Sequence, residues 1–507
     1  MVEPLDRGKG PDLTKGITLA DFDGRQMLRG HVDNASVLLA HVGDEVLAVD
    51  AICTHYGGAL DEGLLSGDTV RCPLHHACFS LRTGEAISAP AFDPLHCWSV
   101  ERDGDRIVIR EKVRPAPAPA TAGADEPRDI VIIGAGAAGF ACAEMLRRRG
   151  YEGSLTMLSE DAEAPYDRPN LSKDYLAGDA PPEWMPLRPE TYYLENAIDL
   201  HLGVSVAAID TEARNVVLDD GRVLEFDRLL IATGAEPVRP PISGADLAHV
   251  FTLRSFADGR ALAAAAQKAK SAVVLGSGFI GLETAAALRT RGLDVHVVSL
   301  DARPLEKVLG AELGDFIAEL HEEHGVTFHM GTSIGAIAPD AVTLNSGERI
   351  EADLVILGAG VRPRTALAEA AALPVDRGIL IDEYLETPVA GIYAAGDVAR
   401  WPGAGDGETM SVEHWVVAER QGQVVAENML GESVSFRDAP FFWSAHYDVT
   451  IRYVGHAEAW DETVIDGDVA AQDASVSYRR GGQTLAVATL GRDMEALAAR
   501  HGVTRAE

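Results

Sequence analysis

The sequence predicts a multidomain protein with an all-β N-terminal domain, two doubly wound α/β domains and a C-terminal α+β domain. Its 507 residues are too many for one hydrophobic core. Residues 16–112 alternate short apolar segments with Gly and Asp, as antiparallel strands do. Glycine-rich turns follow the apolar segments at 129–133 and 271–275, and each opens a helix, which is typical of parallel doubly wound sheets. From Phe436 the chain returns to strand-like segments and a short helix.

Composition limits the partners and the compartment that we expect. The formal net charge is −34, from 44 basic and 78 acidic residues. The negative electrostatic field of such a protein repels nucleic acid and anionic lipid. Five cysteines, an odd and small number, favour a reducing compartment, so we expect a cytoplasmic location. The N-terminal residues lack the apolar segment of a secretion signal. The apolar stretch 129–146 contains turn glycines and predicts a strand, turn and helix rather than a membrane span.

A linker separates the all-β domain from the rest of the chain. Proline and alanine alternate in residues 113–127, VRPAPAPATAGADEP, and this composition favours a semi-rigid polyproline II segment. The expected boundaries are 16–112 for the all-β domain, 128–250 with 365–435 for the first α/β domain, 251–364 for the second, and 436–507 for the C-terminal domain.

Two short segments of the all-β domain carry metal-ligand residues. The first supplies Cys53 and His55, and the second supplies Cys72 and His75. Two Cys and two His side chains suit either zinc or an iron–sulfur centre. Zinc fingers usually pair Cys with Cys and His with His, whereas these mixed pairs favour a two-iron cluster with thiolates on one iron and imidazoles on the other. We expect His76 to be an exposed neighbour of the ligand His75.

The residues around these ligands, including Gly57, Gly58 and CPLHHACFSLRTG from Cys72 onward, resemble a Rieske ferredoxin domain. The resemblance implies a [2Fe–2S] cluster. Respiratory Rieske proteins join their two loops by a disulfide, and Gly58 and Leu74 stand at those positions here. The similarity is therefore to the soluble ferredoxin type. The remaining cysteines are expected to be core thiols: Cys78, Cys97 and Cys142.

The first glycine-rich turn, Gly134-x-Gly136-x-x-Gly139, predicts a dinucleotide site because a strand precedes it and a helix follows it. Glycine there permits a tight turn and lets a pyrophosphate approach the helix N-terminus. Glu160, at the end of the next strand, is placed to bond a ribose hydroxyl.

Three further segments indicate that this dinucleotide is FAD. PYDRPNLSK at 165–173, ATG at 232–234 and AAGD at 394–397 resemble the FAD site of NAD(P)H-dependent ferredoxin reductases and apoptosis-inducing-factor-like oxidoreductases. The resemblance implies that Arg168 and Lys173 lie against the flavin and that Asp397 holds its ribityl chain. It also assigns FAD contacts to Thr233 and Gly234.

A second motif, Gly276-x-Gly278-x-x-Gly281, marks the nicotinamide cofactor. Ser299 replaces the acid expected at the end of the following strand. Either Asp301 bonds a ribose hydroxyl or Arg303 binds a 2′-phosphate. We expect NADH, with NADPH left open.

The same resemblance implies that Lys173 and Glu283 form a catalytic pair beside the flavin, because both residues match a lysine and a glutamate that pair in the family. The alternative for Glu283 is an ordinary position on a helix surface. It implies that a helix begins at Glu413, His414 and Trp415 and that the backbone N–H groups there point to the flavin pyrimidine. It also implies that an aromatic stretch lies near the isoalloxazine, at Phe441, Phe442 and Trp443. Core positions would explain these aromatic residues equally well.

The resemblance spans about residues 16–500 and is best to the Rieske-fused branch of the apoptosis-inducing-factor-like family. It implies that hydride passes from NAD(P)H to FAD, and that single electrons then pass to the [2Fe–2S] cluster and on to a redox protein or small-molecule acceptor. A disulfide reductase is excluded, since Cys142 is the only cysteine beyond the all-β domain. An NAD(H)-sensing flavoprotein with slow turnover is the alternative, and a homodimer remains open.

Overall fold

The computed structural model describes residues 9–113, 127–403 and 408–503, and its contacts divide the chain into two units. One unit comprises residues up to 121 together with 492–507, and the other comprises residues 122–491. Apart from its ends, the predicted linker 113–127 lies outside the described residues. Helix α9 (Asp493–Val503) belongs to the first unit, where it packs on β5 (Leu64–Ser66), although its sequence continues the C-terminal domain.

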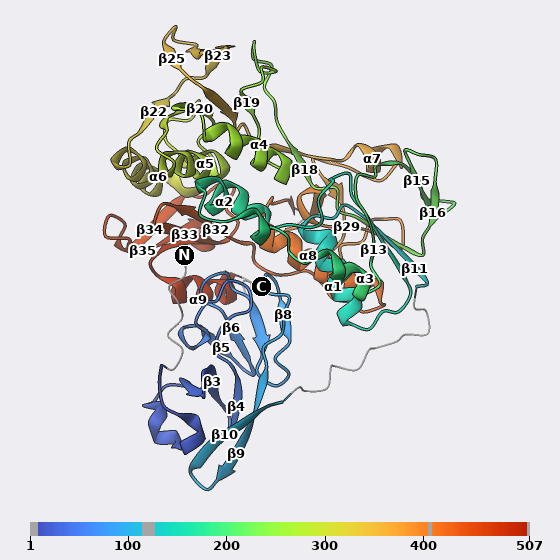
Figure 1. The fold of residues 1–507 in the computed structure, drawn as a ribbon, viewed down its shortest axis with the longest axis vertical. Helices are drawn as coiled ribbons and strands as arrows, with labels where there is room; N and C mark the ends of the chain where they lie inside the picture. The colour runs from blue at the N-terminus through green and yellow to red at the C-terminus, as the bar shows by residue number, and fades with distance from the viewer. Residues whose placement is uncertain (1–8, 114–126, 404–407, 504–507) are drawn as a thin grey trace. The chain divides into compact units, whose positions relative to one another are not determined.

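Two antiparallel sheets form the N-terminal unit (Figure 1). The larger sheet has the strand order β1 (Ile17–Thr18), β10 (Arg106–Val113), β9 (Cys97–Asp103), β4 (Glu45–Asp50), β3 (Ala35–Val42) and β2 (Met27–Val32). The smaller sheet has the order β5, β6 (Thr69–Arg71), β7 (Cys78–Ser80) and β8 (Ala86–Ser88). Alternation along β3 divides the apolar residues between two cores, because successive strand side chains point to opposite faces. Val37 and Leu39 enter one core, while Leu38 and Ala40 enter the core that also holds Cys53.

The second unit contains two parallel five-stranded sheets with equivalent strand orders. The first sheet runs β13 (Asp199–His201), β12 (Ser154–Leu158), β11 (Asp129–Ile133), β17 (Arg228–Ile231) and β29 (Ile392–Ala394). The second runs β22 (Val326–Met330), β21 (Asp294–Ser299), β20 (Ser271–Leu275), β26 (Leu354–Leu357) and β19 (Val250–Phe251). The central strands β11 and β20 are buried almost throughout, as expected of parallel sheets covered on both faces.

A small antiparallel sheet is inserted at the equivalent place in each parallel sheet, just before β17 in the first and just before β26 in the second, so the two halves repeat one design. The interruptions are β14 (Val206–Asp210), β15 (Asn215–Leu218) and β16 (Val223–Glu225) in the first half, and β23 (Ile334–Ala338), β24 (Ala341–Leu344) and β25 (Arg349–Glu351) in the second. Short ladders join the remaining strands: β18 (Ala235–Pro237) with β27 (Val361–Pro363), and β28 (Ile379–Leu380), β30 (Ala399–Pro402) and β31 (Thr409–Met410).

A five-stranded antiparallel sheet completes the second unit, in the order β32 (Phe441–His446), β33 (Val449–Gly455), β36 (Gln483–Leu490), β35 (Asp473–Arg480) and β34 (Glu462–Asp468). Its apolar face shares one hydrophobic cluster with helices of the second α/β half, through residues such as Ile451, Tyr478, Leu282 and Leu309. The C-terminal sheet therefore packs directly on α5 (Phe279–Thr290) and α6 (Glu306–Glu323).

The other described helices of the second unit are α1 (Ala137–Arg148), α2 (Asp174–Ala177), α3 (Glu190–Glu195), α4 (Phe256–Ala266), α7 (Ala366–Ala370) and α8 (Trp415–Met429). Helices α1 and α8 lie side by side (Figure 1). A Cβ at Gly422 of α8 would lie 2.1 Å from the Ala138 carbonyl oxygen of α1, so only glycine permits this crossing. Among the described residues, no helix has both the length and the apolar character needed to cross a membrane.

Candidate metal and dinucleotide sites

The two cysteine–histidine loops of the N-terminal unit have the same backbone hydrogen bonds. In each, the cysteine N–H donates to the carbonyl five residues later: Cys53 to Gly58 and Cys72 to Ala77, both at 2.9 Å. The N–H four residues later donates back to the cysteine carbonyl, at 3.0 Å in the first loop and 3.2 Å in the second. The two loops therefore fold alike around their cysteines.

The expected cluster ligands come together as two pairs. The thiols of Cys53 and Cys72 are hydrogen-bonded, and this bond together with burial raises the pKa of Cys53. The rings of His55 and His75 lie edge to face, with centroids 5.0 Å apart. Desolvation lowers the pKa of His55 to about 4, so the ring is the neutral imidazole that binds metals. Paired thiols and paired imidazoles are the donor set of a Rieske centre.

Two details show that these residues fit a cluster. His55 Nδ1 is buried and has no hydrogen-bond partner among the described residues. A Cβ at Gly58 would lie 2.6 Å from Cys72 Sγ and 3.0 Å from Leu74 Cδ1. The first loop therefore closes directly on the thiol of the second, and only glycine fits there. The cysteines are buried while both imidazoles are half-buried, which leaves the histidine edge nearer to solvent.

The expectation that His76 is exposed is wrong. Its side chain is fully buried, and its backbone has a φ of 63°. His76 occupies the loop position that Gly57, with a φ of 75°, occupies in the first loop. The shared turn requires left-handed backbone at this position and directs the side chain inward. The three remaining cysteines are buried, as expected of core thiols: Cys78, Cys97 and Cys142.

The first glycine motif connects β11 to α1, and each glycine has a different environment. A Cβ at Gly134, where φ is 104°, would lie 2.2 Å from the Ala232 carbonyl oxygen. A Cβ at Gly139 would lie 1.9 Å from the Gly134 carbonyl oxygen, so this glycine lets α1 pack on β11. At Gly136 the nearest atom would be Arg168 Nη2, 3.8 Å away. The turn is therefore open at Gly136, where a pyrophosphate approaches the uncapped helix N-terminus.

Positive charge gathers beside this open turn. A cavity of about 30 Å³ is lined by Gly136, Arg168 and residues after β12. The buried Nε of Arg168 has no hydrogen-bond partner among the described residues. Arg254 bonds Asp397 Oδ2 at 2.5 Å, and burial, with Arg168 nearby, lowers the pKa of Arg254. The unpartnered guanidinium donor of Arg168 beside an open glycine turn fits the phosphates of a dinucleotide.

Sequence reasoning missed Arg254, which the structure places against Asp397. Its only local signal is its position just before the capping box of Ser255 and Asp258 that begins α4. Two other expected FAD contacts lie at the edge of this site: Glu160 forms an ion pair with Arg364, and Thr233 Oγ1 donates to the Arg364 carbonyl oxygen at 2.9 Å.

The second glycine motif repeats the geometry of the first. A Cβ at Gly276, where φ is 112°, would lie 2.2 Å from the Gly358 carbonyl oxygen, and a Cβ at Gly281 would lie 2.3 Å from the Gly276 carbonyl oxygen. A Cβ at Gly278 would meet no atom within 4 Å. The second half thus has an open turn between β20 and α5, suited to another pyrophosphate.

The residues expected to choose between NADH and NADPH already have partners within the chain. Ser299 is buried, and its Oγ lies 2.9 Å from the Ser277 Oγ. Asp301 pairs with Lys307 at 2.7 Å. Arg303 forms ion pairs on two sides, with Asp315 at 2.6 Å and Glu306 at 3.1 Å.

Lys173, at the start of α2, and Glu283, on the helix α5 that follows the second glycine motif, form the expected ion pair, with Nζ 2.8 Å from Oε2. Glu283 is almost completely buried, although α5 could have presented it to solvent. The same Oε2 accepts a hydrogen bond from Ser172 at 2.5 Å. Lys173 also donates to the Pro169 carbonyl oxygen at 3.1 Å. The plain helix-surface alternative for Glu283 is therefore wrong.

The start of α8 and the aromatic stretch of β32 are in contact. The rings of His414 and Phe442 have centroids 4.4 Å apart, and burial lowers the pKa of His414 to about 3. Phe442 also meets Phe279, the first residue of α5, at 4.7 Å. Of the aromatic residues, Phe441 is core, whereas Phe442 and Trp443 are half-buried. Glu413 is exposed, and Trp415 begins the helix.

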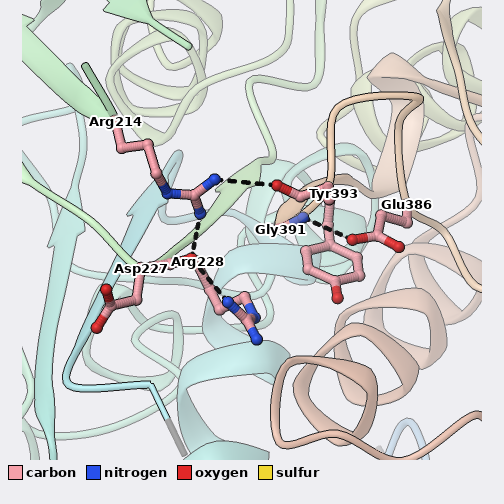
Figure 2. A pocket seen from close by; sticks show the side chains of 7 residues that line it. Arg214, Asp227, Arg228, Glu386, Gly391 and Tyr393 are labelled. Atoms are coloured by element: carbon pink, nitrogen blue, oxygen red, sulfur yellow. Dashed lines mark hydrogen bonds between the residues drawn. The ribbon is translucent and has the colours of Figure 1, made fainter. Parts of the chain in front are cut away.

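A separate cavity of about 270 Å³ lies at the amino ends of β17 and β29 (Figure 2). Arg214 spans it and donates to the Ala390 carbonyl oxygen at 3.0 Å and to that of Asp227. Glu386 accepts from the Gly391 N–H at 2.6 Å. The glycine motif follows the carboxyl end of β11, the parallel neighbour of β17, and Asp397 follows the carboxyl end of β29, so this cavity is not the dinucleotide site.

Comparison with known families decides the class. Residues 128–422 match the family model described as pyridine nucleotide-disulphide oxidoreductase. The chain belongs to this family. Residues 17–99 match the Rieske [2Fe-2S] domain, and residues 441–507 match the reductase C-terminal domain. This oxidoreductase therefore uses FAD and a nicotinamide nucleotide in its α/β halves and a [2Fe–2S] cluster in its N-terminal domain.

Named relatives of the oxidoreductase cover most of its length. It is 32% identical to apoptosis-inducing factor 3 of Mus musculus over 93% of this chain and 81% of the relative. It is 39% identical to rhodocoxin reductase of Rhodococcus erythropolis over 73% of this chain and 88% of the relative. The solved covalent putidaredoxin reductase–putidaredoxin complex has a TM-score of 0.72, with 34% identity over 75% of this chain and 94% of that chain.

Proposed function

We propose that this oxidoreductase takes hydride from NADH onto FAD and sends single electrons through its own Rieske cluster to an acceptor protein. One observation carries the proposal: one unit holds two open glycine turns and the Lys173–Glu283 ion pair, whose glutamate stands on the helix that follows the second turn. The same polypeptide carries paired thiols and imidazoles. When bound, the flavin supplies the conversion between two-electron and one-electron chemistry.

The chain's own residues position and charge this site. Arg168, whose Nε has no partner among the described residues, binds the phosphates at the first turn, and Gly278 admits the nicotinamide nucleotide at the second. Arg254 holds the Asp397 carboxylate in place. Lys173 keeps a positive charge beside the flavin, because Glu283 and the Pro169 carbonyl oxygen fix its ammonium group. Fusing the Rieske domain to the reductase raises the effective concentration of the first electron acceptor. Relatives named ferredoxin–NAD(+) reductase components support a redox protein as the final partner.

Stopped-flow spectroscopy of Cys72→Ser tests this order of transfer. The variant should lose its iron–sulfur absorbance, keep FAD and its reduction by NADH, and no longer reduce cytochrome c as a one-electron acceptor protein. Cys97→Ser is the matched control, because Cys97 is a buried thiol of the same core that is not a ligand. If Cys72→Ser no longer oxidises NADH, or still reduces cytochrome c at the wild-type rate, the proposed order is wrong. Wild-type protein that binds NADH tightly but turns over slowly with every acceptor would favour the NAD(H)-sensing role.

A further inference from the structure

A chain of hydrogen bonds leads from the Lys173–Glu283 pair into the C-terminal sheet. Glu283 Oε1 accepts from Ser444 Oγ at 2.7 Å, and the same hydroxyl lies 3.0 Å from His446 Nε2. On the far side of the ring, His446 Nδ1 lies 3.1 Å from His321 Nε2. The chain therefore connects α5, β32 and α6 within one unit.

This chain is completely buried. Ser444, His446 and His321 are all 0% exposed. Satisfying Glu283 Oε1 would need only one donor, the Ser444 hydroxyl, so the two imidazoles beyond it are not required to stabilise the carboxylate. Polar groups in the interior cost free energy even when they are paired, and apolar side chains of similar size would fill the same space. The continuation through His446 and His321 therefore points to a role other than packing.

The hydrogen atoms along the chain have one consistent order. Ser444 has a single hydroxyl hydrogen and gives it to the Glu283 carboxylate, so His446 Nε2 must donate to Ser444 Oγ. His446 Nδ1 is then the acceptor for His321 Nε2–H, and His321 Nδ1 carries a lone pair. Burial lowers the pKa of His446 to about 3 and that of His321 well below its ordinary value, so both rings are neutral. Every donor therefore points toward Glu283.

The outer end of the chain approaches the surface. His321 Nδ1 is buried and has no hydrogen-bond partner among the described residues. The ring of Tyr447 covers His321 with centroids 5.3 Å apart, and it stacks at 3.6 Å on the exposed His324. Tyr447 lies in the tight turn between β32 and β33 with a φ of 58°, a conformation that favours glycine. The half-buried Tyr447 therefore contacts both the buried His321 and the exposed His324.

We propose that Ser444, His446 and His321 form a proton relay that connects Glu283 with solvent at the Tyr447 turn. The inference rests on the proposed function, which places Glu283 beside the flavin. Hydride leaves NADH, the oxidised nicotinamide departs as a cation, and one negative charge stays in the pocket. A nearby negative charge favours the protonated form of a buried carboxylate. Glu283 then takes one proton through the relay and returns it when the electrons leave.

The proton transfer balances without any further reactant. A solvent proton binds His321 Nδ1, and His321 gives its Nε2 proton to His446 Nδ1. His446 gives its Nε2 proton to Ser444 Oγ, and Ser444 gives its hydroxyl proton to Glu283 Oε1. His321, His446 and Ser444 each gain one proton and lose one, whereas Glu283 gains one and is the only group whose charge changes. The charged and titratable groups around the relay are Lys173, Glu283, Arg289, His321, His324, His446 and Tyr447.

Proton uptake tests the relay directly. Holoenzyme in weakly buffered solution with a pH-indicator dye is mixed anaerobically with one equivalent of NADH, and dye and flavin absorbance are recorded together. Wild-type protein should take up about one proton per flavin during flavin bleaching. In the His446→Gln variant, the flavin should bleach at the wild-type rate, but proton uptake should be at least about tenfold slower. Glu283→Gln should show no uptake through this route.

His329→Gln is the matched control, because His329 Nε2 also lies 3.0 Å from a second imidazole, that of His296, in the same half of the protein and away from Glu283. It should leave uptake unchanged. His321→Gln provides a second interruption if His446→Gln loses FAD or melts early. Uptake at the wild-type rate in folded, FAD-loaded His446→Gln or His321→Gln overturns the relay alone. Wild-type flavin that NADH does not bleach overturns the proposed function and the relay together.

Discussion

Among single residues, Gly58 has the closest contact with the predicted cluster ligands. A methyl group there would lie 2.6 Å from Cys72 Sγ, so Gly58→Ala should displace the thiol and lower the iron content while the domain stays folded. Gly67→Ala is the control, since a Cβ at this turn glycine meets no atom within 4 Å while its φ of 59° strains the backbone, so it tests backbone strain without contact with a ligand. Iron analysis and visible absorbance measure the outcome. Full iron occupancy in Gly58→Ala would contradict the contact.

The cofactor preference depends on the ion pairs of Arg303. Asp315 and Glu306 hold its guanidinium, so wild-type protein should prefer NADH. The double variant Asp315→Asn, Glu306→Gln frees Arg303 for a 2′-phosphate and should raise kcat/KM for NADPH about tenfold, the worth of one charge-assisted hydrogen bond. Asp340→Asn, which frees the exposed Arg349 in the same half, should change neither value. A strong NADPH preference in wild-type protein would show that Arg303 leaves its partners when the cofactor binds.

Sequence reasoning at this scale succeeds where spacing and resemblance combine. The metal ligands and the Lys173–Glu283 pair could be named because motifs carry them. The structure brings together the two cysteines, the two histidines, and Lys173 with Glu283. Arg254 and His446 belong to no motif, and each meets its partner only through the tertiary fold. The burial of His76 was also hidden, because it depends on the backbone conformation of a loop that the sequence does not display.

At the scale of elements, the three glycines of one strand–turn–helix unit should give different phenotypes when altered. Gly139→Ala places a methyl group 1.9 Å from the Gly134 carbonyl oxygen, so it should separate α1 from β11 and lower the unfolding free energy by about 1–3 kcal/mol or more. Gly136→Ala has open space and should leave the fold intact while weakening FAD binding. Thermal unfolding and FAD content distinguish the two. Equal loss of stability in both variants would refute the assignment of separate roles.

The repeated β–turn–α–β units were predictable because parallel strands, turn glycines and amphipathic helices leave local patterns. The inserted sheets β14–β16 and β23–β25 were not, since short antiparallel strands such as Val223–Glu225 are half-exposed and carry little periodicity. The equivalence of the two halves became visible only when the strand orders could be compared.

At the scale of the whole molecule, α9 determines how the reductase half can be isolated. Ala496 and Leu497 of this helix are fully buried, and the helix packs on β5 of the N-terminal unit, so we expect a chain of residues 127–507 to expose them. Residues 127–491 should therefore aggregate less than residues 127–507, bind FAD and oxidise NADH, yet fail to reduce cytochrome c. Light scattering and NADH oxidation measure these properties. A higher melting temperature for 127–507 would show that α9 also stabilises the reductase half.

The assignment of α9 to the N-terminal unit also means that the described chain begins and ends in the same unit, with the reductase half inserted between 121 and 492. The order of the two units along the polypeptide therefore depends on the position of the chain termini, which a circular permutation can move. A circular permutant that starts at Pro127, continues through α9 into a short artificial connector and re-enters at Lys9 would keep every described sheet and helix. Such a rearranged chain carries its Rieske domain at the C-terminal end of the polypeptide.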